Sequence, residues 1–120
     1  MNLFEQFEIP EILKKSLQAM NFVEPTPIQA QAIPEALQGK DILGSAQTGT
    51  GKTGAFGIPA VSRLINNPLE QALVLTPTRE LAMQVAGVMN KLLSGTSIRS
   101  ALLIGGDSMG KQLSQLRQKP

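Results

Sequence analysis

The segment Ala46–Thr53, which reads Ala-Gln-Thr-Gly-Thr-Gly-Lys-Thr, constrains the fold more than any other part of this sequence. Its glycines permit a tight bend, because glycine has no side chain to clash at positive backbone φ angles. An apolar stretch, Asp41 to Ala46, precedes the bend, and a helical pattern follows it from about Gly51 to Ile65. The sequence therefore predicts a strand, a glycine-rich loop and a helix in direct succession.

This loop matches the P-loop pattern, with alanine in place of the first glycine. Inward-pointing N–H groups and the positive end of the next helix attract phosphate. Lys52 brings a positive charge for the outer phosphates, and Thr53 brings a hydroxyl ligand for Mg²⁺. We expect Lys52 and Thr53 to serve catalysis with ATP and Mg²⁺. The alternative is a glycine-rich turn with an exposed lysine. The expected nucleotide-binding residues of the loop are Ala46, Gln47, Thr48, Gly49, Thr50, Gly51, Lys52 and Thr53.

Composition narrows the chemistry further. The chain has 120 residues, enough for one small domain, and its net charge of +2 does not by itself indicate a nucleic-acid partner. It contains no cysteine and no histidine, which excludes disulfides, thiolate zinc sites and nucleophiles or bases of those two types. No signal-peptide pattern and no apolar run of membrane-spanning length is present, so a cytoplasmic protein is expected.

The remaining pattern alternates between helices and apolar stretches. Helices are predicted over 10–20, from Thr26 onward with Pro34 ending or kinking the helix, and over 78–93. A last helical pattern carries Met109, Leu113 and Leu116. Strands are predicted over 41–46, 72–76 and 98–104. Strands that alternate with helices indicate an α/β fold with a mostly parallel sheet and flanking helices.

Four motifs together give the chain a family resemblance. They are Phe22–Gln29 (Phe-Val-Glu-Pro-Thr-Pro-Ile-Gln), Ala46–Thr53, Pro77–Ala82 (Pro-Thr-Arg-Glu-Leu-Ala) and Gly105-Gly106. In this order and spacing, the chain resembles the DEAD-box RNA helicases. The resemblance implies the N-terminal portion of a RecA-like P-loop domain, with a Q-motif region over 1–40 and a P-loop α/β portion over 41–120. It also implies RNA-stimulated ATP hydrolysis coupled to RNA unwinding. Asn21 departs from the family's usual glycine, and we expect little consequence.

The resemblance assigns adenine recognition to Gln29 and Phe4. A carboxamide offers a donor and an acceptor in one plane, which suits the N6 and N7 edge of adenine. The alternative for Gln29 is a helix-capping role, because it lies three residues after Thr26. Phe4 stands where the family has an aromatic residue that packs on adenine. Taken alone, a phenylalanine at the position of Phe4 is more often a core or packing residue, and we expect Phe7 to be one.

RNA contact is implied for two further motifs, at Pro77, Thr78, Arg79, Gly105 and Gly106. Thr78 and the N–H groups at the start of its helix can hold a phosphate, and Arg79 adds positive charge. A glycine pair allows close approach of an RNA backbone. The alternatives are a helix cap with an Arg–Glu surface pair for the first motif and a plain turn for the second.

The Asp-Glu-Ala-Asp motif of the family does not occur in these residues. Glu70, Glu80 and Asp107 are the only acids after Thr53, and none lies directly at the end of a predicted strand. A nucleotide- or RNA-binding fragment without turnover is therefore the alternative function. The family's sheet order implies that the three predicted strands are not neighbours, so we expect unpaired strand edges or self-association.

Overall fold

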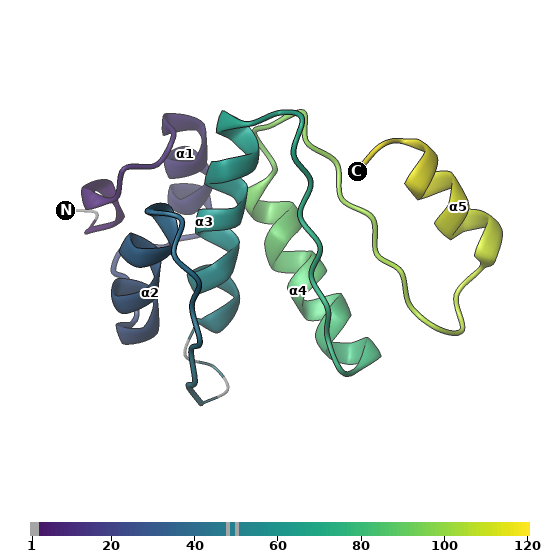
Figure 1. Ribbon diagram of the computed structural model, residues 1–120, viewed down its shortest axis with the longest axis horizontal. Helices are drawn as coiled ribbons and strands as arrows, with labels where there is room; N and C mark the ends of the chain where they lie inside the picture. Colours follow the sequence, from purple (N-terminus) through teal and green to yellow (C-terminus); the bar gives the residue numbers. More distant parts are fainter. Residues whose placement is uncertain (1–2, 48, 50) are drawn as a thin grey trace.

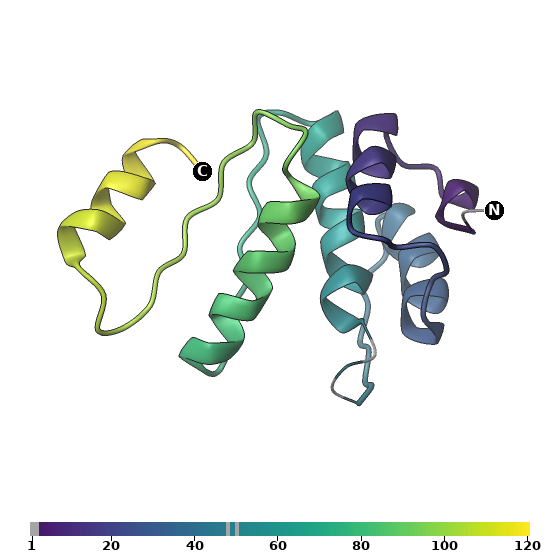
Figure 2. The same ribbon diagram turned by 180° about the vertical axis from the view of Figure 1, so that it is seen from behind.

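The computed structural model describes residues 3–47, 49 and 51–120. Helices α1 to α4 lie side by side, whereas α5 stands apart at the C-terminal end (Figures 1 and 2). Within the described ranges, no helix is long and apolar enough to cross a membrane. The elements are η1 (Leu3–Gln6, a 3₁₀-helix), α1 (Glu11–Ala19), α2 (Pro27–Leu37), α3 (Lys52–Asn66), α4 (Arg79–Leu92) and α5 (Met109–Arg117).

The end of α1 explains the residue that departs from the family pattern. Asn21 has a φ of 59°, in the left-handed region that favours glycine. The Phe22 N–H donates to the Leu17 carbonyl over 2.9 Å, and the Asn21 N–H donates to the Gln18 carbonyl over 3.0 Å. These two bonds form a Schellman C-cap, which requires a left-handed residue at this position. Asparagine is the residue that best tolerates this conformation after glycine.

Helix α2 begins where the sequence predicts and runs through Pro34 as one helix. Thr26 is its N-cap residue, Pro27 is its first residue, and Gln29 accepts the Thr26 N–H over 3.0 Å. The prediction that Pro34 ends this helix is wrong, because α2 is continuous to Leu37, whereas the expected end of the helical turn at Leu37 and Gly39 is confirmed. A proline costs the helix one N–H bond. The fully buried neighbour Ile33 and a second Schellman cap at Gly39 hold the last turn in place.

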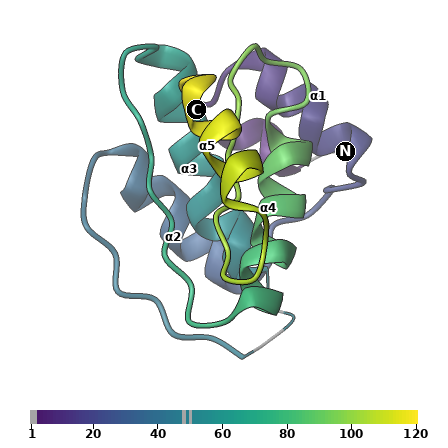
Figure 3. The ribbon, with the colours of Figure 1, turned by 90° about the vertical axis from the view of Figure 1, so that its right-hand side faces the viewer.

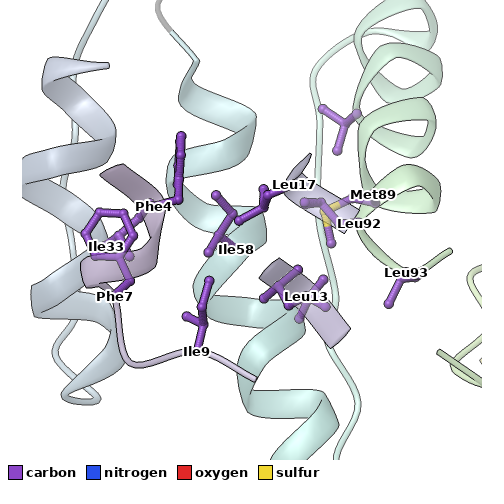
Figure 4. Packing of buried hydrophobic residues seen from close by; sticks show 12 residues of the cluster. Phe4, Phe7, Ile9, Leu13, Leu17, Ile33, Ile58, Met89, Leu92 and Leu93 are labelled. Atoms are coloured by element: carbon purple, nitrogen blue, oxygen red, sulfur yellow. The ribbon is translucent and has the colours of Figure 1, made fainter. Parts of the chain in front are cut away.

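The core lies between the helices and is apolar. Side chains from η1, α1, α2, α3 and α4 meet around Ile58 of α3 (Figure 4). Burying a side chain of this size contributes about 1.5–3 kcal/mol relative to leaving it exposed. Phe7 belongs to this core, as predicted. The buried cluster is Phe4, Phe7, Ile9, Leu13, Leu17, Ile33, Ile58, Val61, Val85, Met89, Leu92 and Leu93.

A glycine sets the distance between α3 and α4. A Cβ atom at Gly57 would lie 2.9 Å from the Met89 sulfur and 3.0 Å from a Leu92 methyl carbon. Real Cβ atoms do not approach so closely, so a side chain here would force the ends of the Met89 and Leu92 side chains to shift and would overpack this contact. Gly87 on α4 has open space where its Cβ would be. Gly57 is therefore needed for the close contact between α3 and α4, whereas Gly87 has no such role, although both lie inside helices.

The predicted sheet is not formed. Among the described residues no strand is present, and the segments 41–46, 72–76 and 98–104 run extended without a backbone hydrogen bond between any two of them. Figure 3 shows 41–46 and 72–76 passing along the helices well separated from each other. We call these three segments the open segments. The α/β prediction is thus corrected to a helical fold, because an extended segment becomes a strand only when a neighbour pairs with its backbone.

Helix α5 forms as predicted but buries none of its residues. Two of its glutamines hold it against the last open segment. Gln115 accepts the Leu102 N–H over 3.0 Å, and Gln112 donates to the Ile104 carbonyl over 3.0 Å. Leu113 and Leu116 remain close to half exposed, so the predicted apolar face of α5 has no core to join in this part of the chain.

The glycine contrast between α3 and α4 gives a stability prediction. Gly57→Val should lower the free energy of unfolding by about 1–3 kcal/mol, because the new side chain overpacks the helix interface. Gly87→Ala should raise it by about 0.5–1 kcal/mol through helix propensity alone. Urea unfolding followed by circular dichroism at 222 nm measures both values. Equal effects of the two substitutions would contradict the packing described here.

The left-handed conformation of Asn21 gives a second prediction. Asn21→Gly should leave stability unchanged or raise it slightly, whereas Asn21→Ala should lower it by about 1 kcal/mol. The same urea titration compares the two variants. A stable Asn21→Ala variant would mean that the C-cap of α1 does not require positive φ.

Candidate nucleotide site

The glycine-rich loop turns sharply into α3. Gly49 and Gly51 both have a φ of 84°, and Gly51 is the N-cap of α3 with no side-chain capping bond. The first N–H groups of α3 therefore have no side-chain acceptor at the cap, and they face the loop with the positive end of the helix dipole. This geometry fits a phosphate group. Thr48 and Thr50 were also predicted to bind nucleotide, and they lie outside the described residues.

Lys52 and Thr53 occupy the first turn of α3, as the sequence predicts. Lys52 is exposed, and it forms no ion pair with any carboxylate in the described ranges. Thr53 is half-buried. The Lys52 ammonium is therefore available to an anion at the helix start. Ala46 is half-buried at the entrance of the loop, and Gln47 beside it is exposed.

Gln29 joins α2 to the phosphate loop. Its Nε2 donates to the Gly51 carbonyl over 3.1 Å, and its Oε1 accepts the Thr26 N–H over 3.0 Å. A carboxamide carries two N–H groups and two lone pairs, so one donor and one acceptor are left over. The side chain performs the capping role and also bonds the loop. The two interpretations of Gln29 are therefore compatible, and its contact with adenine stays a prediction.

The contact between Gln29 and the loop leaves no room for other side chains. A Cβ at Gly51 would lie 2.5 Å from Nε2 of Gln29, and a Cβ at Gly54 would lie 2.7 Å from the same atom. At Gly54 a ring carbon of Phe22 is also within 3.5 Å. Glycine at both positions is thus a condition for the amide of Gln29 to reach the loop. Sequence reasoning missed this link, because no local pattern relates Gln29 to Gly51 across 22 residues.

Phe4 lies in the core. It is 2% exposed, and its ring centroid is 5.8 Å from that of Phe7 and 5.7 Å from that of Phe22. This is the arrangement expected for a core residue, which was the alternative interpretation of Phe4. Its stacking on adenine stays a prediction. Phe22, which is only half-buried, connects this aromatic cluster to Gly54 behind the loop.

The two motifs predicted to contact RNA meet in space. Gly106 has a φ of 82°, and a Cβ at this position would lie 2.9 Å from Nη1 of Arg79. The Arg79 guanidinium therefore lies over the glycine turn, although 27 positions separate the two residues in sequence. Thr78 caps α4 by accepting the Leu81 N–H over 3.1 Å, which is the capping alternative. Pro77 and Gly105 are exposed beside this pair.

The acids after the phosphate loop are engaged elsewhere or exposed. Arg63 donates from Nε to Glu70 over 2.6 Å and from Nη2 over 3.2 Å. These hydrogen bonds hold the pKa of the Glu70 carboxyl below its ordinary value. Asp107 accepts the Ser108 N–H and pairs with Lys111. The described residues contain no group of three or more acidic side chains that could hold a metal ion.

Comparison with known proteins identifies the family to which this chain belongs. A sequence profile of the DEAD/DEAH box helicases matches residues 26–120, which span the Gln29 motif, the phosphate loop and the Arg79–Gly106 pair. The chain belongs to the DEAD/DEAH box helicase family. Residues 1–120 are 48% identical over 118 residues to the ATP-dependent rRNA helicase RRP3 of Lodderomyces elongisporus, a helicase of which the chain spans 23%.

Solved helicase structures follow the same backbone course. The RNA helicase Prp28 from Chaetomium thermophilum, bound to ADP, superposes with a TM-score of 0.88 at 36% identity, over 98% of this chain and 30% of that one. A DEAD box protein from Methanococcus jannaschii superposes with a TM-score of 0.84 at 33% identity, over 94% of this chain and 31% of that one. The chain thus covers less than a third of these helicases.

Proposed function

We propose that residues 1–120 bind an adenine nucleotide and Mg²⁺ as the nucleotide-binding part of an ATP-dependent RNA helicase. The observation that carries this proposal is the hydrogen bond from Gln29 to Gly51, which ties an amide suited to adenine to a loop suited to phosphate. Membership of the helicase family and the 48% identity to RRP3 support it.

Each residue of the site has a distinct role in this proposal. Gln29 presents its second N–H and its second lone pair to the N7 and N6 edge of adenine. Backbone N–H groups at the start of α3 and the Lys52 ammonium hold the phosphates. Mg²⁺, held at the Thr53 hydroxyl, would neutralise charge on the outer phosphates. Because Gln29 and the phosphate loop share a hydrogen bond, adenine recognition and loop conformation are coupled.

RNA binding is proposed for the surface around Arg79 and Gly106. A guanidinium is a strong donor to phosphate, and the glycine turn beneath it lets a backbone approach. Pro77, Thr78 and Gly105 border this pair. In the parent helicases such contacts would couple ATP hydrolysis to RNA unwinding. The second candidate function is binding of nucleotide or RNA without turnover, which is favoured because the Asp-Glu-Ala-Asp sequence does not occur in residues 1–120.

The nucleotide proposal predicts the effect of removing the Lys52 charge. Lys52→Ala should weaken binding of Mg-ATP by roughly 10–100-fold, because a charge-assisted hydrogen bond to phosphate is lost. Lys15→Ala removes the same charge from an exposed position on α1 and should leave affinity unchanged. Isothermal titration with Mg-ATP measures both. Gln29→Ala should weaken ATP more than inorganic triphosphate, and equal losses for the two ligands would refute adenine recognition by Gln29.

Steady-state phosphate release, with and without single-stranded RNA, then separates the two candidate functions. RNA-stimulated turnover that Lys52→Ala abolishes would establish an enzyme in these residues. Binding of Mg-ATP without turnover would support the binding-only function. Failure of the wild-type chain to bind either an adenine nucleotide or single-stranded RNA would contradict both.

The RNA proposal predicts a charge-specific effect at Arg79. Arg79→Ala should weaken binding of single-stranded RNA by roughly three- to tenfold and reduce its salt dependence, because one phosphate contact is lost. Lys91→Ala removes an equal charge from the far end of α4 and is the matched control. Fluorescence anisotropy at several salt concentrations measures both. Equal losses for the two variants would indicate nonspecific attraction rather than a site.

A further inference from the structure

A cavity of about 820 Å³ lies between α2 and α3, toward the ends of these helices that are remote from the glycine-rich loop. Both helices begin beside that loop, where Gln29 bonds Gly51, and they lie side by side (Figure 1). The two helices and the connection between η1 and α1 line the cavity. Its volume is within the range of sites that bind small molecules. It shares no residue with the proposed nucleotide site.

Small and cyclic side chains leave this space open. Ala30 and Pro34 of α2 and Pro59 and Ala60 of α3 form two of its walls. None of these side chains is long enough to fill a gap between two helices. Phe7, a core residue, adds apolar surface from the connection before α1. The cavity therefore offers apolar walls from three elements, which suit the hydrocarbon part of a ligand.

Two groups at the cavity can accept hydrogen bonds from a ligand. Ser62 lines the cavity and is only 2% exposed, and its hydroxyl has no hydrogen-bond partner among the described residues. Pro34 has no N–H, so the Ala30 carbonyl lacks the donor that a helix normally supplies four residues further on. A buried polar group without a partner is unfavourable. Both groups therefore favour a ligand that donates hydrogen bonds.

The charge left unbalanced at the cavity is negative. Glu8 lines the cavity with an exposed side chain, and it forms no ion pair in the described parts of the chain. Arg63 also lines the cavity, but its guanidinium is bound to Glu70 over 2.6 and 3.2 Å.

The end of α2 adds to this negative charge. The helix has no basic residue in its last turn, so the partial negative charge of its last carbonyls is not balanced within the helix. Lys40, which follows the helix, is paired with Glu35 over 2.7 Å. The cavity therefore attracts a cation locally, although the net charge of the whole chain is +2.

We propose that this cavity binds an alkylammonium group, with its hydrocarbon chain along the apolar walls and its ammonium beside Glu8. An ammonium brings three N–H donors for the Ser62 hydroxyl and the carbonyls, together with the positive charge that Glu8 attracts. An anion would instead meet the Glu8 carboxylate and a guanidinium already bound to Glu70. Polyamines and the lysine side chains of other proteins both carry this group. The proposal does not rest on nucleotide binding.

The test is a titration of residues 1–120 with n-butylammonium chloride, followed in ¹⁵N–¹H correlation spectra. We expect saturable shifts at the amides of Glu8, Gly39 and Asn67, which line the cavity. n-Butanol has nearly the same shape without the charge, and it should bind roughly threefold or more weakly. Butylammonium affinity should fall as the salt concentration rises, because Glu8 is exposed.

Two variants and a matched control locate the binding site. Glu8→Gln should weaken butylammonium binding by roughly three- to tenfold, because the carboxylate that attracts the ammonium is lost. Glu80→Gln removes the same charge from an exposed position on α4 outside the cavity, and it should leave the affinity unchanged. Ser62→Ala should weaken binding by roughly two- to fivefold without lowering the free energy of unfolding, because its hydroxyl serves the ligand and not the fold.

Spermidine and the peptide acetyl-Gly-Lys-Gly-amide distinguish the two sources of the alkylammonium group. Tighter binding of spermidine would support the proposal with a polyamine as the ligand, and tighter binding of the peptide would support it with a lysine of a partner protein. The absence of saturable shifts at the cavity, equal binding of butanol and butylammonium, or equal losses for Glu8→Gln and Glu80→Gln would overturn the proposal.

Discussion

Packing of α3 against its neighbours is the interaction on which the rest of this structure depends. Ile58 and Val61 are completely buried, and α3 contacts α1, α2 and α4. Because no strand ladder is present among the described residues, the packing of α1 to α4 fixes the positions of these helices, whereas hydrogen bonds of Gln112 and Gln115 hold α5. The position of the glycine-rich loop follows from the packing of α3, because the loop leads directly into the first turn of that helix.

The hydrogen bond between Gln29 and Gly51 joins α2 to the start of α3 at the proposed nucleotide site. Helix α2 presents the amide, α3 receives it beside its N-terminus, and glycines at 51 and 54 make the approach possible. The Gln29 motif and the glycine-rich loop are separate motifs in the sequence, but in the structure they are joined by a hydrogen bond. A change that shifts α2 against α3 would alter the loop even if it touched no loop residue.

The helices and most of their ends could be predicted from the sequence. The pairing of the extended segments could not, and the predicted sheet is not formed. Thr26, Pro27 and Gln29 set the start of α2 through local chemistry, and Thr78 does the same for α4. Strands depend instead on partners distant in sequence, so an apolar run such as 72–76 predicts an extended backbone but not its pairing. The contacts of Gln29 with Gly51 and of Arg79 with Gly106 also join residues distant in sequence, so local sequence patterns could not predict them. Pro34 does not end α2, although a proline removes one N–H bond from a helix, and its neighbour Ile33 is fully buried in the core.

The glutamines of α5 have a consequence for how this chain behaves in concentrated solution. Gln112 and Gln115 form hydrogen bonds with backbone groups of the 98–104 segment. These bonds occupy groups that would otherwise be free to pair with the backbone of another chain. Among the described residues, no side chain forms a comparable hydrogen bond with the backbone of the 72–76 segment. Aggregation of the isolated chain would therefore begin at 41–46 or 72–76 rather than at 98–104.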